Sequence, residues 1–160
     1  MVAELKIDVG AGAKREAGYL TVDVTPYFKP DFLASVTDLP FDDESVGEVR
    51  CWHVLEHLPR EQLITAMNEM WRVLKVDGVL DIEVPVFPHW PAMADPTHIS
   101  FYVPQTFDYF IRCDKPHEHG GEGCFENHRL MYGIKPWSDR GRARLHDAQI
   151  ARVALGKLQG

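Results

Sequence analysis

The short spacing between the first two predicted strands constrains the fold most. Apolar residues alternate over residues 4–9, a glycine-rich turn follows, and a second extended segment covers residues 19–24. Parallel strands are usually joined by about a dozen residues or more, most often with a helix among them. Residues 10–18 are too few for such a helix. The sequence therefore predicts that the first connection has no crossover helix.

The rest of the chain alternates further strands with one helix. Strands are expected at residues 32–36, 46–54 and 79–85, and a closing pair at residues 125–135 and 149–157. The helix is expected over residues 59–75, starting at Pro59 and ending before Asp77-Gly78. Its apolar stripe recurs at helical spacing and consists of Leu63, Met67, Met70 and Leu74. Prolines between residues 85 and 104 exclude long regular elements there.

This order predicts an α/β fold in a single domain, residues 1–160. We expect a mostly parallel sheet with few helices and a C-terminal antiparallel strand pair. Residues 4–9 and 79–85 are apolar on alternate positions only, whereas strands buried on both faces are apolar throughout. One face should therefore carry the helix, and the other should be thinly covered or covered by a second subunit. This pattern predicts a homodimer.

Charge and composition exclude several classes of function. The net charge is −7 and the basic residues are dispersed, apart from Arg140, Arg142 and Arg144, so a nucleic-acid partner is not expected. That arginine group is most simply a solvated turn, although it could bind an anionic acceptor. No apolar run reaches the length of a membrane span. With no room for a signal peptide before the first strand, we expect a cytoplasmic protein.

Two motifs at the first strand ends suggest a nucleoside-type ligand. Asp8-Val9-Gly10-Ala11-Gly12 closes the first strand, where glycines let the backbone turn sharply and approach a ligand. Asp23 closes the second strand, where a carboxylate can accept the hydroxyls of a ribose. Alone, the glycines could be an ordinary turn, and Asp23 a solvated strand-end residue.

Two more motifs follow at the next strand ends. Asp38 could accept a hydrogen bond from an adenine amino group while the amide of Leu39 donates to the ring. Alternatively, this segment is a turn anchored by Phe41. His53 begins the run HVLEHLP at the end of the fourth predicted strand, which could instead be a plain strand-to-helix connection. All four motifs stand where open α/β sheets bind ligands.

Taken together, the motifs resemble the small class I S-adenosylmethionine-dependent methyltransferases, which have a Rossmann-like sheet. The resemblance covers about residues 4–110 and rests on the stretches IDVGAG, GYLTVDV, DLPFDDESVGEV, HVLEHLP and MWRVLKVDGVLDIEVP. Two departures stand out. The first crossover helix of the family is missing, and the sequence Lys75-Val76-Asp77-Gly78 replaces the usual Pro-Gly-Gly turn.

The resemblance implies a cofactor, S-adenosylmethionine, and a set of residues that bind it. The glycine turn would pass under the methionine part, Asp23 would hold the ribose, and His53 would lie beside the methionine part or the methyl group. The full expected set is Asp8, Gly10, Ala11, Gly12, Asp23, Val24, Asp38, Leu39 and His53.

Catalysis would depend mainly on alignment, because the sulfonium already activates the methyl group. A general base is needed only for some acceptors. The resemblance points to His53, and to Asp95 and His98 in the segment after the fifth strand, as the catalytic residues. Alternatively, His98 has only a structural role and holds a loop in place.

We expect no metal ligand set. Cys113, His117, His119, Cys124 and His128 could supply four ligands to zinc, but their spacing matches no finger motif, and His117-Glu118-His119 looks like a loop.

The leading hypothesis is therefore an enzyme, a methyltransferase acting on a small molecule. The alternative is a module that binds S-adenosylmethionine without transfer, as a regulatory or degenerate partner subunit. A nicotinamide-dependent oxidoreductase ranks third, because it would need a G-x-G-x-x-G turn with a following helix. A zinc-dependent role ranks fourth.

Overall fold

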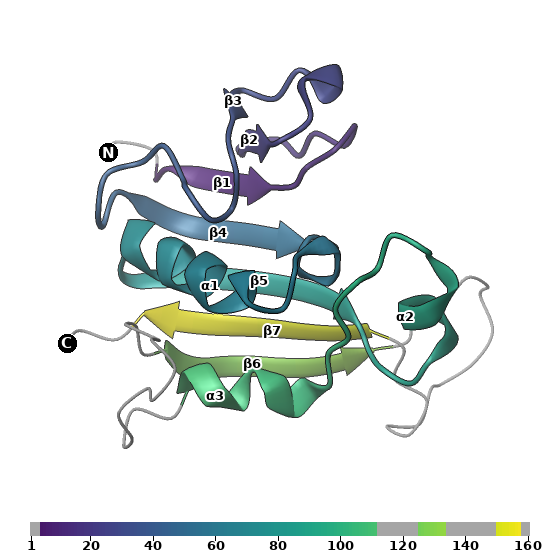
Figure 1. Ribbon diagram of the computed structural model, residues 1–160. Coiled ribbons are helices and arrows are strands. Elements are labelled where there is room, and N and C mark those ends of the chain that lie inside the picture. Colours follow the sequence, from purple (N-terminus) through teal and green to yellow (C-terminus); the bar gives the residue numbers. More distant parts are fainter. Residues whose placement is uncertain (1–3, 112–124, 134–149, 158–160) are drawn as a thin grey trace.

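The computed structural model describes residues 4–111, 125–133 and 150–157. The sheet contains β1 (Lys6–Val9), β2 (Leu20–Asp23), β3 (Phe32–Leu33), β4 (Val46–Trp52), β5 (Leu74–Pro85), β6 (Phe125–Gly133) and β7 (Ile150–Lys157). The helices are α1 (Gln62–Val73), α2 (Trp90–Ala94) and α3 (Asp108–Ile111), with short 3-10 turns η1 (Pro26–Phe28), η2 (Leu55–His57) and η3 (Pro104–Thr106). Figure 1 shows α1 lying across one face of the sheet.

The strand order reverses direction at β1, which creates a switch point in the sheet. The sheet runs β3-β2-β1-β4-β5-β7-β6, and the first five strands are parallel to one another. β7 runs antiparallel to both β5 and β6. From β1 the chain builds outward through β2 to β3, and then returns to place β4 on the other side of β1. Such a switch point leaves a crevice at the carboxyl ends of the two central strands. The predicted Rossmann-like α/β fold with few helices is confirmed.

Residues 10–19 join β1 to β2 without a helix, as predicted. This loop folds back over the charged face of the sheet. The guanidinium of Arg50 on β4 lies 4.1 Å from the ring centre of Tyr19, and Nζ of Lys14 in the loop lies 5.5 Å from the ring centre of Trp52 on β4. Arg50 also pairs with Glu16 in the loop, at 3.6 Å. Cation–π contacts and an ion pair thus fasten the loop to the sheet in the place of a helix.

The opposite face carries the hydrophobic core. α1 buries Leu63, Ala66, Met67, Met70 and Val73 in the same cluster as the apolar side chains of the central strands. Those strand residues are Ile7, Val9, Val49, Cys51, Leu80 and Ile82. The alternation that was visible in the sequence is therefore the alternation between this core and the charged face.

The predicted end of the helix needs correction. α1 stops at Val73, and Leu74 is already extended and paired with Val46 of β4. Residues 75–78 lie opposite Gly47 alone, so the turn expected at Asp77-Gly78 is a bulge inside β5. Asp77 adopts a positive φ of 63° there. Burial of Val73 and Leu74 explains the difference, because both side chains are fully enclosed by the core.

Among the described residues, none of the helices is both long and apolar enough to cross a membrane. The proline-rich segment after β5 holds only α2 and η3, as its composition predicted.

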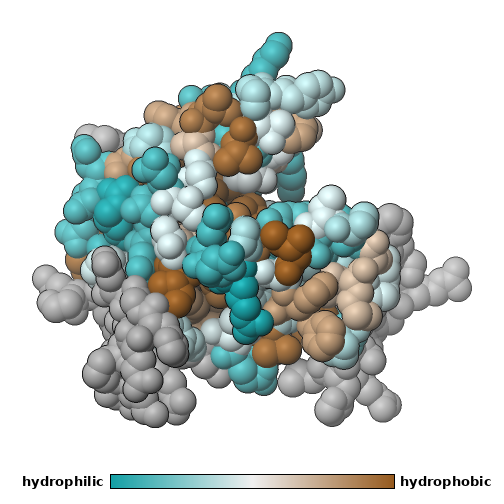
Figure 2. Space-filling model, viewed as in Figure 1, coloured by the Kyte–Doolittle hydropathy of each residue, from teal (hydrophilic) through white to brown (hydrophobic). Residues whose placement is uncertain are grey.

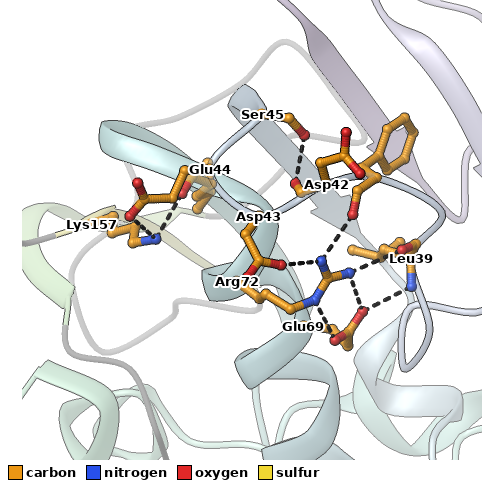
Figure 3. Close-up of polar contacts among 10 residues, drawn as sticks. Leu39, Asp42, Asp43, Glu44, Ser45, Glu69, Arg72 and Lys157 are labelled. Atoms are coloured by element: carbon orange, nitrogen blue, oxygen red, sulfur yellow. Dashed lines mark hydrogen bonds and ion pairs between the residues drawn. The ribbon is translucent and has the colours of Figure 1, made fainter.

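A charged cluster ties α1 to the loop after β3. Arg72 on α1 donates to both carboxylate oxygens of Glu69, to the carbonyls of Leu39 and Phe41, and to the carboxylate of Asp43. Figure 3 shows the guanidinium at the centre of these contacts. The loop is thereby held against the last turns of α1.

This cluster corrects one expected role of Leu39. Its amide donates to Glu69 Oε2 at 3.0 Å, and the residue is buried. The amide that we expected to read an adenine ring is therefore already used within the protein. Sequence reasoning missed this because Glu69 lies on the polar side of α1, thirty residues away in the chain.

We expect Glu69→Gln to lower the free energy of unfolding by about 1–2 kcal/mol at neutral pH, because it removes a two-pronged pairing with Arg72. The pKa of Glu69 is lowered in the folded chain, first by the Arg72 hydrogen bonds. The stabilisation is thus complete above the unfolded pKa of about 4.3. It is lost as the pH falls through the lower folded value.

Urea unfolding of the wild type and the variant from pH 7 to pH 3 checks this prediction, with exposed Glu61→Gln on the same helical segment as the control. A difference in stability that stays constant over this range would contradict it.

Candidate functional site

The glycine turn lies at the switch point, and its two glycines have different surroundings. Gly10 has φ of +68°, and a β-carbon on it would lie 2.2 Å from Cγ2 of Val54, just after β4. Gly12 also has a positive φ, +57°, but no atom lies within 4 Å of the place a β-carbon would take. Gly10 thus permits close packing inside the protein, whereas Gly12 faces open space.

Asp23 ends β2 and is buried beside the same turn. Its Oδ2 accepts the amide N–H of Gly12 at 2.9 Å, and its Oδ1 accepts that of Thr25 at 2.8 Å. A carboxylate has about four acceptor positions. Each oxygen therefore has capacity for one more donor, such as a ligand hydroxyl.

These residues line one cavity of about 460 Å³, a size typical of small-ligand pockets. Among the residues that line it are Gly10, Gly12, Asp23, Val24, His53 and His57. In Figure 2 the surface is hollowed between the β1–β3 end of the molecule and the segment after β5, with hydrophobic side chains on both sides.

Four of the expected cofactor residues do not line this cavity. Asp8 lies on the charged face, 3.6 Å from Arg50, and burial raises the pKa of its carboxyl. Ala11 lies in the turn between the two glycines. Asp38 is exposed, and Leu39 is buried against α1 as described above.

The cavity has further walls that sequence reasoning missed. Phe28 from η1 and residues 34–36 after β3 contribute to its lining. The signal that could have found residues 34–36 is topological. β3 is parallel to β2, so its carboxyl end must reach the same edge of the sheet as Asp23.

His53 lies directly after β4 with a positive φ of 55° and is held between two carboxylates. Its Nδ1 is 3.1 Å from Oε1 of Glu56, and its Nε2 is 2.9 Å from Oε1 of Glu83. These hydrogen bonds, Glu56 first, raise the pKa of His53 to about 9. At neutral pH the imidazole is therefore charged and donates to both carboxylates.

The segment after α2 docks onto the turn η2, which follows His53. The amides of Ile99 and Ser100 both donate to the carbonyl oxygen of Glu56, at 2.9 Å and 3.1 Å. The hydroxyls of Ser100 and Tyr102 donate to the carbonyls of Leu58 and Leu55. Two motifs forty residues apart in the chain are thus brought together beside the cavity.

Within this segment the expected catalytic residues have structural partners. Asp95 Oδ1 accepts the amide and hydroxyl of Thr97, at 2.8 Å and 2.6 Å, and these bonds lower the pKa of the Asp95 carboxyl. His98 is 3.0 Å from the carbonyl of Ala92 through Nδ1. Neither Asp95 nor His98 lines the cavity itself, whereas His57, packed edge-on against the His98 ring, does.

The cysteine and histidine group and the arginine group fall largely outside the described residues. Cys113, His117, His119 and Cys124 lie in residues 112–124, and the three arginines lie in residues 134–149. His128 is part of β6, where only the backbone is described.

Comparison with known proteins agrees with this geometry. A family model described as a methyltransferase domain matches residues 7–82. No curated protein sequence matches the chain.

Three solved structures illustrate the likeness of fold. A chain from the complex of the Haloferax volcanii Trm112 methyltransferase activator with a methyltransferase has a TM-score of 0.72 at 14% identity, covering 99% of this chain and 83% of that one. A SAM-dependent methyltransferase from Archaeoglobus fulgidus has a TM-score of 0.65 at 14% identity, covering 98% and 87%.

The third is the 1,6-didemethyltoxoflavin-N1-methyltransferase of Burkholderia thailandensis, solved with 1,6-didemethyltoxoflavin and S-adenosylhomocysteine. It has a TM-score of 0.63 at 13% identity, covering 97% of this chain and 71% of that one. Residues 7–82 are thus similar to a methyltransferase domain, and the three solved structures share the fold of this chain, in agreement with its strand order and with the cavity at the switch point.

Proposed function

We propose that this protein transfers a methyl group from S-adenosylmethionine to a small-molecule acceptor. The observation that carries the proposal is the convergence of Gly12, Asp23 and His53 on one cavity at the sheet's switch point. The proposal includes the antiparallel β6 and β7 as the closing part of the fold.

The cavity offers a distinct partner for each part of the cofactor. The free acceptor positions of Asp23 suit the ribose hydroxyls. Phe28, Val24 and Val36 provide apolar walls for the adenine. Gly12 leaves room for the methionine part. We keep Asp38 as a residue near the adenine, because its amide donates to the carbonyl of Ser35, which lines the cavity.

The group around His53 suits a positively charged ligand. Glu56 and Glu83 contribute two carboxylates against one imidazole, so its net charge is negative even when His53 is protonated. A sulfonium and an ammonium group both carry positive charge and are attracted to such a site. His53 faces the cavity with 43% of its side chain exposed.

The bound cofactor supplies a methyl group that is already activated for transfer. The protein's own contribution is to align the acceptor and exclude water. Both nitrogens of His53 already have carboxylate partners, so we assign it to holding and orienting rather than to proton removal. Asp95 and His98 are proposed on the acceptor side, because their segment packs on η2 beside the cavity.

We propose a small molecule as the acceptor, and no nucleic acid, because the net charge of −7 would repel phosphates. The structural neighbour that binds 1,6-didemethyltoxoflavin shows that this fold serves a small acceptor in another protein. A neighbour in complex with an activator makes a partner protein a second proposal. We also propose a cytoplasmic location.

We also propose a homodimer, but no longer on the basis of the one-sided strand pattern. Asp8, Arg50 and Asp81 on the charged face are already buried within one chain, so that face gives it no support. Exposed apolar side chains gather instead in the segment after β5. They are Phe87, Trp90, Met93, Ile99, Phe101 and Val103.

Transfer is tested directly by incubating the protein with methyl-labelled S-adenosylmethionine and a panel of small acceptors. Label recovered in one acceptor class is the expected result. Tight cofactor binding without transfer to any acceptor would contradict the enzymatic part of the proposal.

Asp23→Ala is expected to weaken S-adenosylhomocysteine binding more than about tenfold, because the ribose loses charge-assisted hydrogen bonds. Calorimetry with Asp42→Ala, an exposed carboxylate outside the cavity, as the control checks this. Equal affinity of the two variants would refute the ribose assignment.

Gly12→Ala is expected to weaken cofactor binding at least about tenfold, because the added methyl group would enter the space the ligand needs. Gly18→Ala is a matched control. Gly18 also has a positive φ, +88°, and open surroundings, but it does not line the cavity. Both variants should lose about 1 kcal/mol of stability from the left-handed backbone, and only Gly12→Ala should lose affinity.

If the protein is a homodimer, light scattering at micromolar concentration should give twice the mass of one chain. The mass of a single chain would refute it.

A further inference from the structure

Three side chains beside the cavity bring together a set of atoms that could bind a metal ion. One carboxylate oxygen of Glu56 and one ring nitrogen each of His57 and His98 lie within 4.8 Å of one another. Glu56 and His57 come from η2, and His98 from the segment docked on it. In the proposed methyl transfer Glu56 acts through Oε1, which bonds His53, whereas Glu56 Oε2 and the ring of His57 have no assigned contact.

The hydrogen bonds of His98 fix which nitrogen is free. Its Nδ1 lies 3.0 Å from the carbonyl oxygen of Ala92. A carbonyl only accepts, so Nδ1 carries the hydrogen and Nε2 carries the lone pair. The Asp95 oxygen at 3.8 Å from Nε2 is too distant for a hydrogen bond.

The same reasoning holds for His57. Its Nδ1 is 3.2 Å from both the carbonyl oxygen and the hydroxyl oxygen of Thr97. The Thr97 hydroxyl donates its hydrogen to Asp95 at 2.6 Å, so it acts as an acceptor toward His57. Nδ1 of His57 therefore donates, and its Nε2 also has a free lone pair. Asp95 thus sets the orientation of His57 through Thr97.

Glu56 supplies the negative charge. It is only 1% exposed, and while Oε1 bonds His53, Oε2 has no hydrogen-bond partner among the residues that the structure describes. A buried oxygen left in this state costs about 1–3 kcal/mol or more. A cation would offset that cost.

We propose that Glu56, His57 and His98 bind a divalent transition-metal ion of the zinc type. Two imidazoles and one carboxylate form a familiar ligand set for such ions and leave coordination positions open. Metal-bound histidines typically donate their other N–H to a carbonyl or carboxylate, as both histidines do here. Magnesium and calcium prefer oxygen ligands and do not fit.

Binding requires little rearrangement. Zinc lies about 2.0–2.1 Å from nitrogen ligands, which places tetrahedral ligand atoms about 3.3 Å apart. Ligand atoms that now lie up to 4.8 Å apart must therefore approach by as much as about 1.5 Å. His57 is exposed and can make this movement. The metal site shares Glu56 with the group around His53, so metal binding is measured separately from methyl transfer. Its use rests on the proposed function: since His57 also lines the cavity, the metal's open position would hold an oxygen of the acceptor and lower that oxygen's pKa.

The test uses the full chain without a histidine tag, treated with chelator and titrated with Zn²⁺ by calorimetry and with Co²⁺ by visible absorption. The wild type should bind one equivalent that His57→Ala and His98→Ala lose or bind at least tenfold more weakly. His89→Ala, a histidine outside the cluster, should match the wild type. Binding by other cysteines and histidines would be common to all four proteins and cancels in the comparison.

Thermal unfolding of the metal-free proteins shows whether each variant is folded. Because the side chain of His57 is exposed, His57→Ala should disturb the fold least. No zinc binding by the wild type, or equal binding by wild type and both variants, would overturn the proposal. S-adenosylhomocysteine binding, measured on the same proteins with chelator present, reports separately on the cofactor site, so failure of either proposal can be recognised.

Discussion

The end of β1 packs closely against the start of the connection that follows β4. The position of the cavity depends on this contact. Gly10 leaves no space for a β-carbon against Val54, and its amide donates to Val22 of β2. Three strand ends are therefore drawn together at the switch point. Because the glycine turn then opens at Gly12, the same packing that closes the core leaves a cavity beside it.

The two faces of the sheet are covered in different ways. α1 closes the apolar face, and Arg72 extends its hold to the loop after β3. On the charged face, contacts of Arg50 with Tyr19 and Glu16 hold the first connection in the place of a covering helix. The chain thus keeps the strand order of a larger fold with fewer helices. Its functional edge is completed by long-range hydrogen bonds between η2 and the segment after α2.

Local pattern was enough to predict the succession of strands and helix along the chain, the missing first crossover helix and the residues at strand ends, because periodicity and glycine positions report on backbone geometry. Local pattern did not predict features that depend on residues far apart in the chain. The amide of Leu39 is taken by Glu69, and residues 34–36 line the cavity through the parallel pairing of β3. Which ring nitrogen of His57 and of His98 has a free lone pair is set by hydrogen bonds to Thr97 and Ala92, and these contacts cannot be predicted from residue spacing.

A crystal structure of the protein with bound S-adenosylhomocysteine would show where the cofactor binds. We expect the adenosyl group to lie in the cavity between the ends of β1, β2 and β4, with its ribose hydroxyls on the carboxylate of Asp23 and its sulfur toward His53. A ligand bound elsewhere on the molecule, or one that leaves Asp23 without contact, would contradict this expectation.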